Sequence, residues 1–149
     1  MKAALDTNIM AYAEGVGDKT RCQAARNLTQ LLPATNVVIP DQTLGELYRV
    51  LTGKAGRSRE DAREAILSWS TAFSVVDSTW ESFQAAFDLT VDHSLQIWDA
   101  LILSVAAANH CHLLISEDFQ SGFTWRGVTV LDPFLEPSGN LLTDLLEES

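Results

Sequence analysis

The chain has 149 residues, 46% hydrophobic and 20% charged, a composition typical of one globular domain. Its 20 acidic and 10 basic residues give a net charge of −10, which argues against a nucleic-acid binder that relies on a broadly basic surface. Two cysteines are too few for a disulfide framework, and no apolar stretch is long enough to span a bilayer. Asp6 and Asn8 interrupt the N-terminal apolar run, so we expect no signal peptide and a cytoplasmic protein.

The N-terminal third of the chain alternates short apolar runs with segments of helical spacing. The expected elements are a strand over Lys2–Leu5, helices over Thr7–Glu14 and Lys19–Leu32, a strand over Val37–Ile39 and a helix over Asp41–Thr52. Asp41 or Thr43 is the expected N-cap of the last of these helices.

The same alternation continues to residue 131. The expected elements are helices over Ser58–Thr71, from Ser78 or Thr79 to about Asp92, and over Ile97–Ala108, with strands over Phe73–Val76, His112–Ile115 and Val128–Leu131. Ser58 and Asp61 have the spacing of an N-terminal helix cap. Strands that alternate with helices predict an α/β fold, with a mainly parallel sheet covered on both faces.

Four acidic residues follow strands or lie in the helices after them in this pattern. Asp6 follows the first strand and Asp118 the fourth, Glu46 lies in the helix after the second strand, and Asp99 begins the most apolar helix. Functional groups of open parallel sheets collect at the carboxyl ends of the strands. A cluster of carboxylates there is costly unless a cation compensates it, and carboxylate oxygens suit Mg²⁺ or Mn²⁺. Such a site supports phosphodiester hydrolysis.

Each of these acids also has a simpler interpretation. Asp6 is placed as a turn or cap residue, Glu46 as a solvated helix acid, Asp99 as a helix cap and Asp118 as a loop acid. Glu117 competes with Asp118 for the same position. Only the joint occurrence of four acids at these places favours a shared site.

Four motifs carry a family resemblance over about residues 1–133. They are Leu5–Asn8 (LDTN), Gln42–Leu47 (QTLGEL), Trp98–Ile102 (WDALI) and Ser116–Asp118 (SED). Their order and strand context resemble the PIN-domain family, and its toxin members in particular. Serine at 116, where the family often has threonine, keeps the hydroxyl.

The resemblance implies a three-layer α/β/α sandwich with a mostly parallel five-stranded sheet. It implies a Mg²⁺- or Mn²⁺-dependent endoribonuclease of the VapC toxin type, acting on structured RNA such as tRNA or rRNA. Such toxins pair with an antitoxin and are often homodimers. Asp6, Asp99 and Asp118 would then hold the metal, and Glu46 would ligate it or accept a proton. Thr7, Asn8 and Ser116 would orient the carboxylates.

Two further segments are open to interpretation. The bases Arg49, Lys54, Arg57 and Arg59 either contact RNA phosphates or form a solvated helix face with nearby acids. Residues 134–149 form an acidic tail, in which the leucines at 141, 142, 145 and 146 could form a short amphipathic helix that packs or frays.

Three other functions compete with this interpretation. A small-molecule phosphohydrolase would favour a second aspartate at position 8, where Asn8 stands. A receiver-like signalling module needs a late lysine, and none occurs after Lys54. A PIN-fold module that binds RNA or protein without cutting would not need all four acids.

Overall fold

The computed structural model describes residues 1–135 and 139–147. The strands are β1 (Ala3–Leu5), β2 (Val37–Pro40), β3 (Ser74–Val76), β4 (Leu113–Ile115), β5 (Thr124–Trp125) and β6 (Val128–Leu131). The helices are α1 (Thr7–Ala13), α2 (Lys19–Leu31), α3 (Asp41–Thr52), α4 (Arg59–Ala72), α5 (Trp80–His93), α6 (Ile97–Ala108) and α7 (Gly139–Glu147), with a short 3-10 helix, η1, at Ala34–Asn36.

The strands form one sheet in the order β3-β2-β1-β4-β6-β5. Every neighbouring pair is parallel except β5 and β6. The chain moves from β1 outward to β2 and β3, and then returns to place β4 on the other side of β1. The ends of β1 and β4 are therefore the switch point of the topology, where open α/β sheets bind their ligands.

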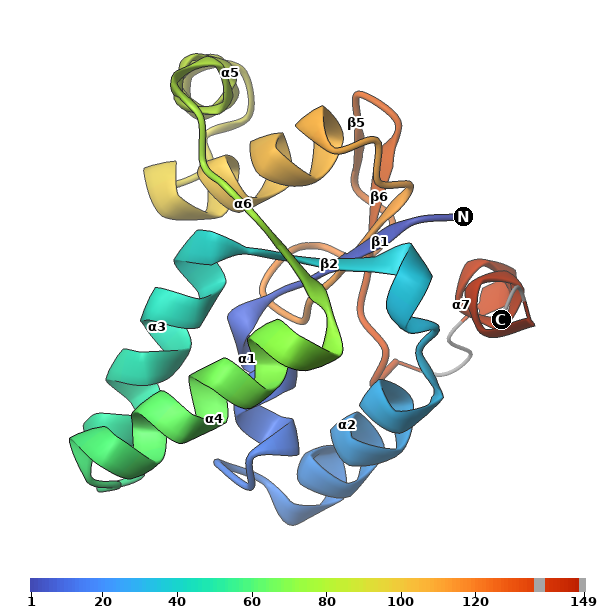
Figure 1. Cartoon of the computed structure of the whole chain (residues 1–149). Helices are drawn as coiled ribbons and strands as arrows, with labels where there is room; N and C mark the ends of the chain where they lie inside the picture. The colour runs from blue at the N-terminus through green and yellow to red at the C-terminus, as the bar shows by residue number, and fades with distance from the viewer. Residues whose placement is uncertain (136–138, 148–149) are drawn as a thin grey trace.

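Alternate residues of the central strands enter two separate cores. Ala3 and Leu5 of β1 belong to one buried cluster, and Ala4 between them belongs to the other. Figure 1 shows the corresponding layers, with α1 to α4 on one side of the sheet and α5 and α6 on the other. The expected three-layer α/β/α architecture is confirmed.

The sheet has six strands where the sequence predicted five. The additional strand, β5, has two residues and pairs antiparallel with β6. Arg126 and Gly127 form the turn between them with φ angles of 46° and 83°, as a two-residue hairpin of this kind requires. The Arg126 guanidinium lies 4.5 Å from the centroid of the Trp125 ring.

Helix caps were predicted in part. The Ser58 hydroxyl accepts a hydrogen bond from the Asp61 amide, and Thr79 caps α5 in the same way. The cap predicted at Asp41 or Thr43 was wrong, because α3 begins directly after Pro40 and the Thr43 hydroxyl donates back to the Pro40 carbonyl. Pro40 itself occupies the N-cap position, and a proline side chain has no group that could accept a hydrogen bond from the first turn.

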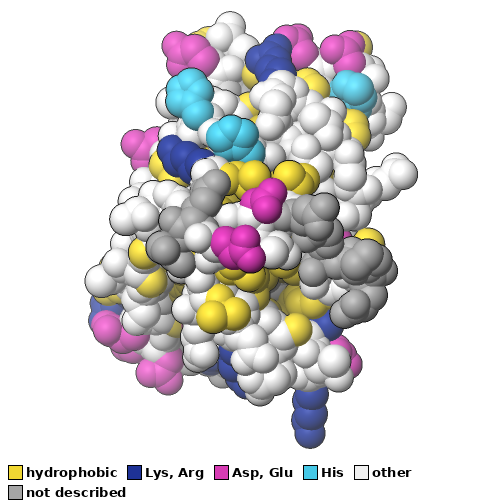
Figure 2. Space-filling model, turned by 90° about the vertical axis from the view of Figure 1, so that its right-hand side faces the viewer, with side chains coloured by type: hydrophobic (Ala, Val, Ile, Leu, Met, Phe, Trp, Pro, Cys, Tyr) yellow, Lys and Arg dark blue, Asp and Glu magenta, His cyan; other side chains and the backbone are white. Residues whose placement is uncertain are grey.

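The C-terminal helix packs on the domain. Leu142 and Leu145 of α7 are buried in the core cluster of the α1–α4 face. Figure 2 shows the side of the molecule that carries α7; the basic side chains coloured there are separated from one another and form no continuous patch. Among the described residues, no helix has the length and apolarity needed to cross a membrane.

Candidate active site

Asp6 is the most buried of the four predicted acids, with 2% of its surface exposed. Its backbone amide donates to the Ile115 carbonyl, which fixes it between the ends of β1 and β4. Its carboxylate accepts hydrogen bonds of 2.7 Å from the Thr7 amide and from the Ser116 hydroxyl. Burial raises its pKa from 3.8 to about 7, although both hydrogen bonds act in the opposite direction.

The loop after β4 is held to α1 through Asn8 and Ser116. The Asn8 side-chain amide donates to the Ser116 hydroxyl at 3.2 Å and accepts from the Glu117 amide at 3.3 Å. Ser116 in turn accepts from the Asp118 amide at 3.0 Å. Asn8 and Ser116, two of the three residues predicted to orient carboxylates, therefore link Asp6 to Asp118.

Glu46 reaches the site from α3, and both of its carboxylate oxygens have partners. The Thr7 hydroxyl donates to one oxygen at 2.9 Å, and the Gln42 side-chain amide donates to the other at 2.7 Å. The Gln42 amide nitrogen also lies 3.4 Å from the Trp98 carbonyl, which ties α3 to the start of α6. The Gln42 carbonyl oxygen is buried and has no hydrogen-bond partner in the described part of the chain.

The charges of the four acids affect one another. The charges of Asp118 and Glu46 both raise the pKa of Asp6. Burial raises the pKa of Asp99, and the charges of Asp118 and Glu46 raise it further. The structure therefore places the four acids, which come from the end of β1, α3, α6 and the loop after β4, near one edge of the sheet.

The donor set fits a hard divalent cation in its chemistry. Burial and mutual repulsion raise the pKa values of Asp6 and Asp99, and a bound cation would stabilise their ionised forms. Oxygen donors suit Mg²⁺ or Mn²⁺. In residues 1–135 and 139–147, however, no three Asp, Glu, His or Cys side chains lie in the arrangement of metal ligands. Asp6, Asp99 and Asp118 are the residues that would hold the ion, with a change in side-chain positions.

Glu117, unlike its neighbour Asp118, binds residues of α1 and α2. The Tyr12 hydroxyl donates to one Glu117 oxygen at 2.6 Å, and the Arg21 guanidinium pairs with the other. Arg21 also lies over the Phe134 ring, 5.2 Å from its centroid. A carboxylate neutralised in this way is a poor metal ligand, so Asp118 is the better candidate.

The structure gives the four predicted RNA-binding bases different surroundings. Arg57 donates to the side chain and to the backbone carbonyl of Glu14, each at 2.7 Å. Lys54 lines a groove of about 470 Å³ that Glu46 and Asp118 also line. Arg49 and Arg59 are exposed on α3 and α4. Only Lys54 of the four therefore lies in the same cavity as the candidate acids.

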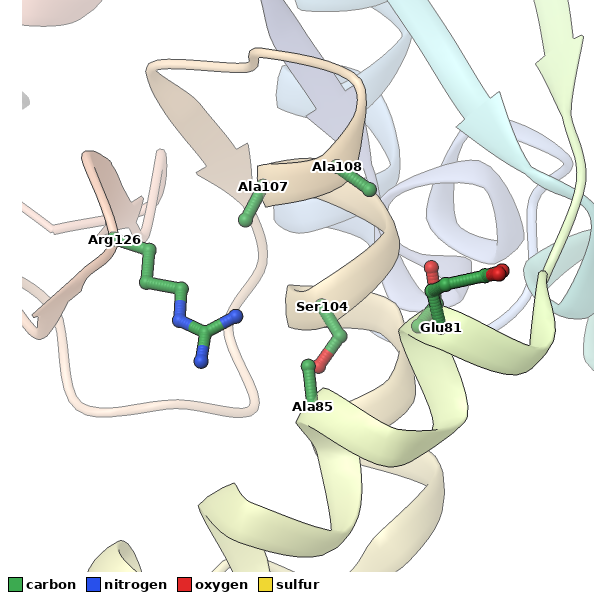
Figure 3. A pocket seen from close by; sticks show the side chains of 7 residues that line it. Glu81, Ala85, Ser104, Ala107, Ala108 and Arg126 are labelled. Carbon is green, nitrogen blue, oxygen red and sulfur yellow. The ribbon is translucent and has the colours of Figure 1, made fainter.

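A second hollow, of about 220 Å³, lies away from the acids. It is enclosed by α5, α6 and the turn after β5, from which the Arg126 side chain extends toward Ser104 (Figure 3). None of the four predicted acids lines it. This hollow is therefore separate from the switch point of the sheet, where the candidate acids lie.

Comparisons with known proteins agree with this geometry. The sequence model of the PIN domain matches residues 3–121. Among solved structures, the fold is similar to VapC20 of Mycobacterium tuberculosis, which is described as a sarcin-ricin loop cleaving toxin. The two sequences are 22% identical, the match covers 84% of this chain and 98% of that chain, and the TM-score is 0.69. No curated protein sequence matches the chain.

Two toxin–antitoxin structures are also similar in fold. A complex from Klebsiella pneumoniae has 20% identity, 89% of this chain and 98% of that chain covered, and a TM-score of 0.66. DNA-bound VapBC from Salmonella typhimurium has 16% identity, the same two coverages and a TM-score of 0.60. Because the family model spans most of the chain and the fold agrees, this chain belongs to the PIN-domain family.

Proposed function

We propose that the chain is a Mg²⁺- or Mn²⁺-dependent endoribonuclease that acts as the toxin of a type II toxin–antitoxin pair. The observation that carries the proposal is the convergence of Asp6, Glu46, Asp99 and Asp118 at the switch point of a PIN domain. Burial, and to a smaller extent the charges of Asp118 and Glu46, raise the pKa values of Asp6 and Asp99, so a bound cation would favour their ionised forms. Nucleases that use metal ions require such a site.

The residues have separate roles in the proposed reaction. Asp6, Asp99 and Asp118 hold the cation, which when bound supplies Lewis acidity at the phosphodiester and at the attacking water. Glu46 accepts the proton of that water, and the hydrogen bonds from Thr7 and Gln42 fix its carboxylate for this purpose. Thr7 and Ser116 orient Asp6, and attack by water leaves a 5′-phosphate and a 3′-hydroxyl.

The proposed substrate is a structured RNA such as tRNA or rRNA, and the proposed partner is an antitoxin. Support comes from the similar structures, one of a toxin described as cleaving the sarcin-ricin loop and others of toxin–antitoxin complexes. Exposed apolar residues on α5, with Trp80 64% and Val91 81% exposed, support a homodimer. Light scattering of the purified chain tests the homodimer.

The nuclease is tested by mapping cut ends in total RNA incubated with the protein and Mg²⁺, Mn²⁺ or chelator. Asp6→Asn removes one proposed ligand with almost no change in volume, and Asp88→Asn makes the same chemical change on the exposed face of α5. We expect discrete cuts that disappear with chelator and with Asp6→Asn, and that remain with Asp88→Asn.

Two other outcomes would contradict the proposal. Cuts that persist in chelator and in Asp6→Asn would remove the role of the carboxylates. Absence of cuts with either metal, in folded protein, would favour a module that binds RNA or protein without cleaving it, and hydrolysis of a small phosphate ester instead would favour a phosphohydrolase. Growth arrest on induction of the wild-type protein, but not of Asp6→Asn, tests the toxin role.

A further inference from the structure

A groove leads away from the candidate acids between α1 and α3. Its volume of about 470 Å³ is within the usual range of ligand clefts, about 300–1,000 Å³. It adjoins a further hollow of about 360 Å³, and Val16, Gly17 and Lys54 line both. The two hollows therefore form one path along the surface, which starts at Glu46 and Asp118.

The walls of the groove follow from helical spacing. Glu46 and Val50 stand four residues apart on α3 and line the groove, and Lys54 lines it from the turn that follows the helix. Asn8 and Tyr12 stand four residues apart on the α1 side. From α3 into the turn after it, the wall is thus acidic at the candidate site, apolar in the middle and basic at its far end.

Lys54 is available to bind an anion. Its side chain is exposed, and it has no ion pair or hydrogen bond within the described residues. The nearby guanidinium groups of Arg21 and Arg57 are instead paired with Glu117 and Glu14. From Glu46 to the end of α3 at Thr52 the helix rises roughly 9 Å, and Lys54 follows in the turn after the helix.

The backbone at Gly17 keeps the groove open beside Tyr12. Gly17 has a φ of +105°, and a Cβ placed on it would lie 2.9 Å from the Tyr12 ring. The Tyr12 hydroxyl is fixed by its bond to Glu117. Val16, Gly17 and Val50 therefore leave a narrow apolar surface that suits a sugar or a base.

We propose that this groove binds the nucleotide next to the cleaved phosphodiester, with Lys54 on its phosphate and Val16 and Val50 against its sugar or base. The inference rests on the proposed ribonuclease function and adds a substrate subsite to it. An RNA strand is favoured over a protein segment because the groove is continuous with the acids where the cleaved phosphate must lie. A free cation at the far end complements the next phosphate of the strand.

The test uses uncut RNA, so that binding is separated from cleavage. In an Asp6→Asn background, we would measure the affinity of a fluorescein-labelled single-stranded RNA over a salt series by fluorescence anisotropy. Lys54→Gln should weaken binding several-fold and reduce the slope of log K against log salt by about 0.7. Lys54→Arg should restore both. Arg63→Gln, an equal loss of charge on an exposed part of α4 outside both hollows, should change neither.

A blocking variant tests the groove itself. Val50→Phe, checked for folding by thermal unfolding, should weaken RNA binding without changing the salt slope, because it fills space and removes no charge. Unchanged affinity and salt slope in Lys54→Gln would overturn the proposal, as would an equal effect of Arg63→Gln. In that case a segment of a partner protein becomes the better occupant.

Failure of the subsite and failure of the ribonuclease function would be distinguishable. If wild-type protein cuts RNA while Lys54→Gln and Val50→Phe bind it normally, the nuclease proposal is supported and the subsite proposal is contradicted. If wild-type protein does not cut RNA but binding still depends on Lys54 and Val50, the groove is an RNA site and the nuclease proposal falls.

Discussion

At the scale of single residues, the buried carboxyl of Asp6 makes stability depend on pH. Its pKa of about 7 exceeds the ordinary value of 3.8, so the folded chain binds this proton more tightly than the unfolded chain does. The resulting stabilisation is complete below about pH 4 and is lost as the pH rises through about 7. In chelator, the free energy of unfolding should fall by up to about 4 kcal/mol over this range.

Urea unfolding between about pH 5 and about pH 8 checks this prediction. Asp6→Asn has no titrating group at this position and should give a flatter profile, whereas Asp88→Asn should keep the fall. An equally steep profile in Asp6→Asn would assign the pH dependence to another group. Addition of Mn²⁺ at about pH 8 should stabilise the wild-type protein more than Asp6→Asn.

Gln42 is the residue predicted to matter most for the position of Glu46. Gln42→Ala removes the 2.7 Å hydrogen bond to the Glu46 carboxylate. Because hydrogen bonds to charged groups contribute about 1.5–3 kcal/mol, we expect kcat to fall roughly 10- to 100-fold, with little change in KM. The measurement is steady-state cleavage of the RNA identified in the cut-site experiment. A matched loss in Gln23→Ala, on exposed α2, would show that the effect is not specific.

The sequence predicted the four candidate acids and the residues Thr7, Asn8 and Ser116 beside them, but not Gln42. Asp6 and Asp118 follow strands, Asp99 begins a helix and Glu46 lies within the helix after β2. These positions can be read along the chain. The choice between Glu117 and Asp118 could not be made, because it depends on Tyr12 and Arg21 from other elements. Gln42 gave no signal, since a glutamine on a helix is ordinary until its partner is known.

At the scale of elements, Arg57 joins the turn after α3 to the end of α1. It donates twice to Glu14, and the Trp69 indole donates to the second Glu14 oxygen at 2.9 Å. Arg57→Ala leaves the half-buried Glu14 carboxylate without its paired guanidinium. This change should destabilise the fold by about 1–3 kcal/mol. Urea unfolding measures the change, and Arg59→Ala, which is exposed, should stay within about 0.5 kcal/mol. Equal effects of both variants would mean that the pair with Glu14 adds nothing.

The elements that the sequence predicted well are those with a long periodic pattern. The expected Ile97–Ala108 and Asp41–Thr52 helices occur with the same bounds. The strand β5 was missed, because two residues carry no alternation and the pairing depends on the turn at Arg126 and Gly127. Tertiary contact, and not local preference, makes that strand.

At the scale of the whole molecule, α7 adds apolar surface to the core of the α1–α4 face. Leu145 is fully buried there and Leu142 is 7% exposed. Leu145→Ala should destabilise the fold by about 2–5 kcal/mol and lower the Tm in thermal unfolding. Leu141→Ala, on the exposed side of the same helix, is the control. No change with Leu145→Ala would mean that residues 1–133 fold without the tail.

The architecture as a whole followed from the order of strands and helices. That order predicted a parallel sheet between two helical layers, and the structure confirms it. Packing of the tail could not be predicted, since four leucines in an acidic segment are equally consistent with a packed or a frayed helix. The difference lies in the surface that α7 meets, which is assembled from distant parts of the chain.

The two buried cysteines have a practical consequence. The Cys22 thiol lies 3.8 Å from the Gly17 carbonyl, beside the groove, whereas Cys111 belongs to the core of the α5–α6 face, where burial raises its pKa to about 11. A protonated, enclosed thiol reacts slowly with alkylating reagents. Each helical layer therefore contains its own chemical reporter, and the rates at which the two sulfur atoms are modified would show which layer opens first when the molecule is warmed.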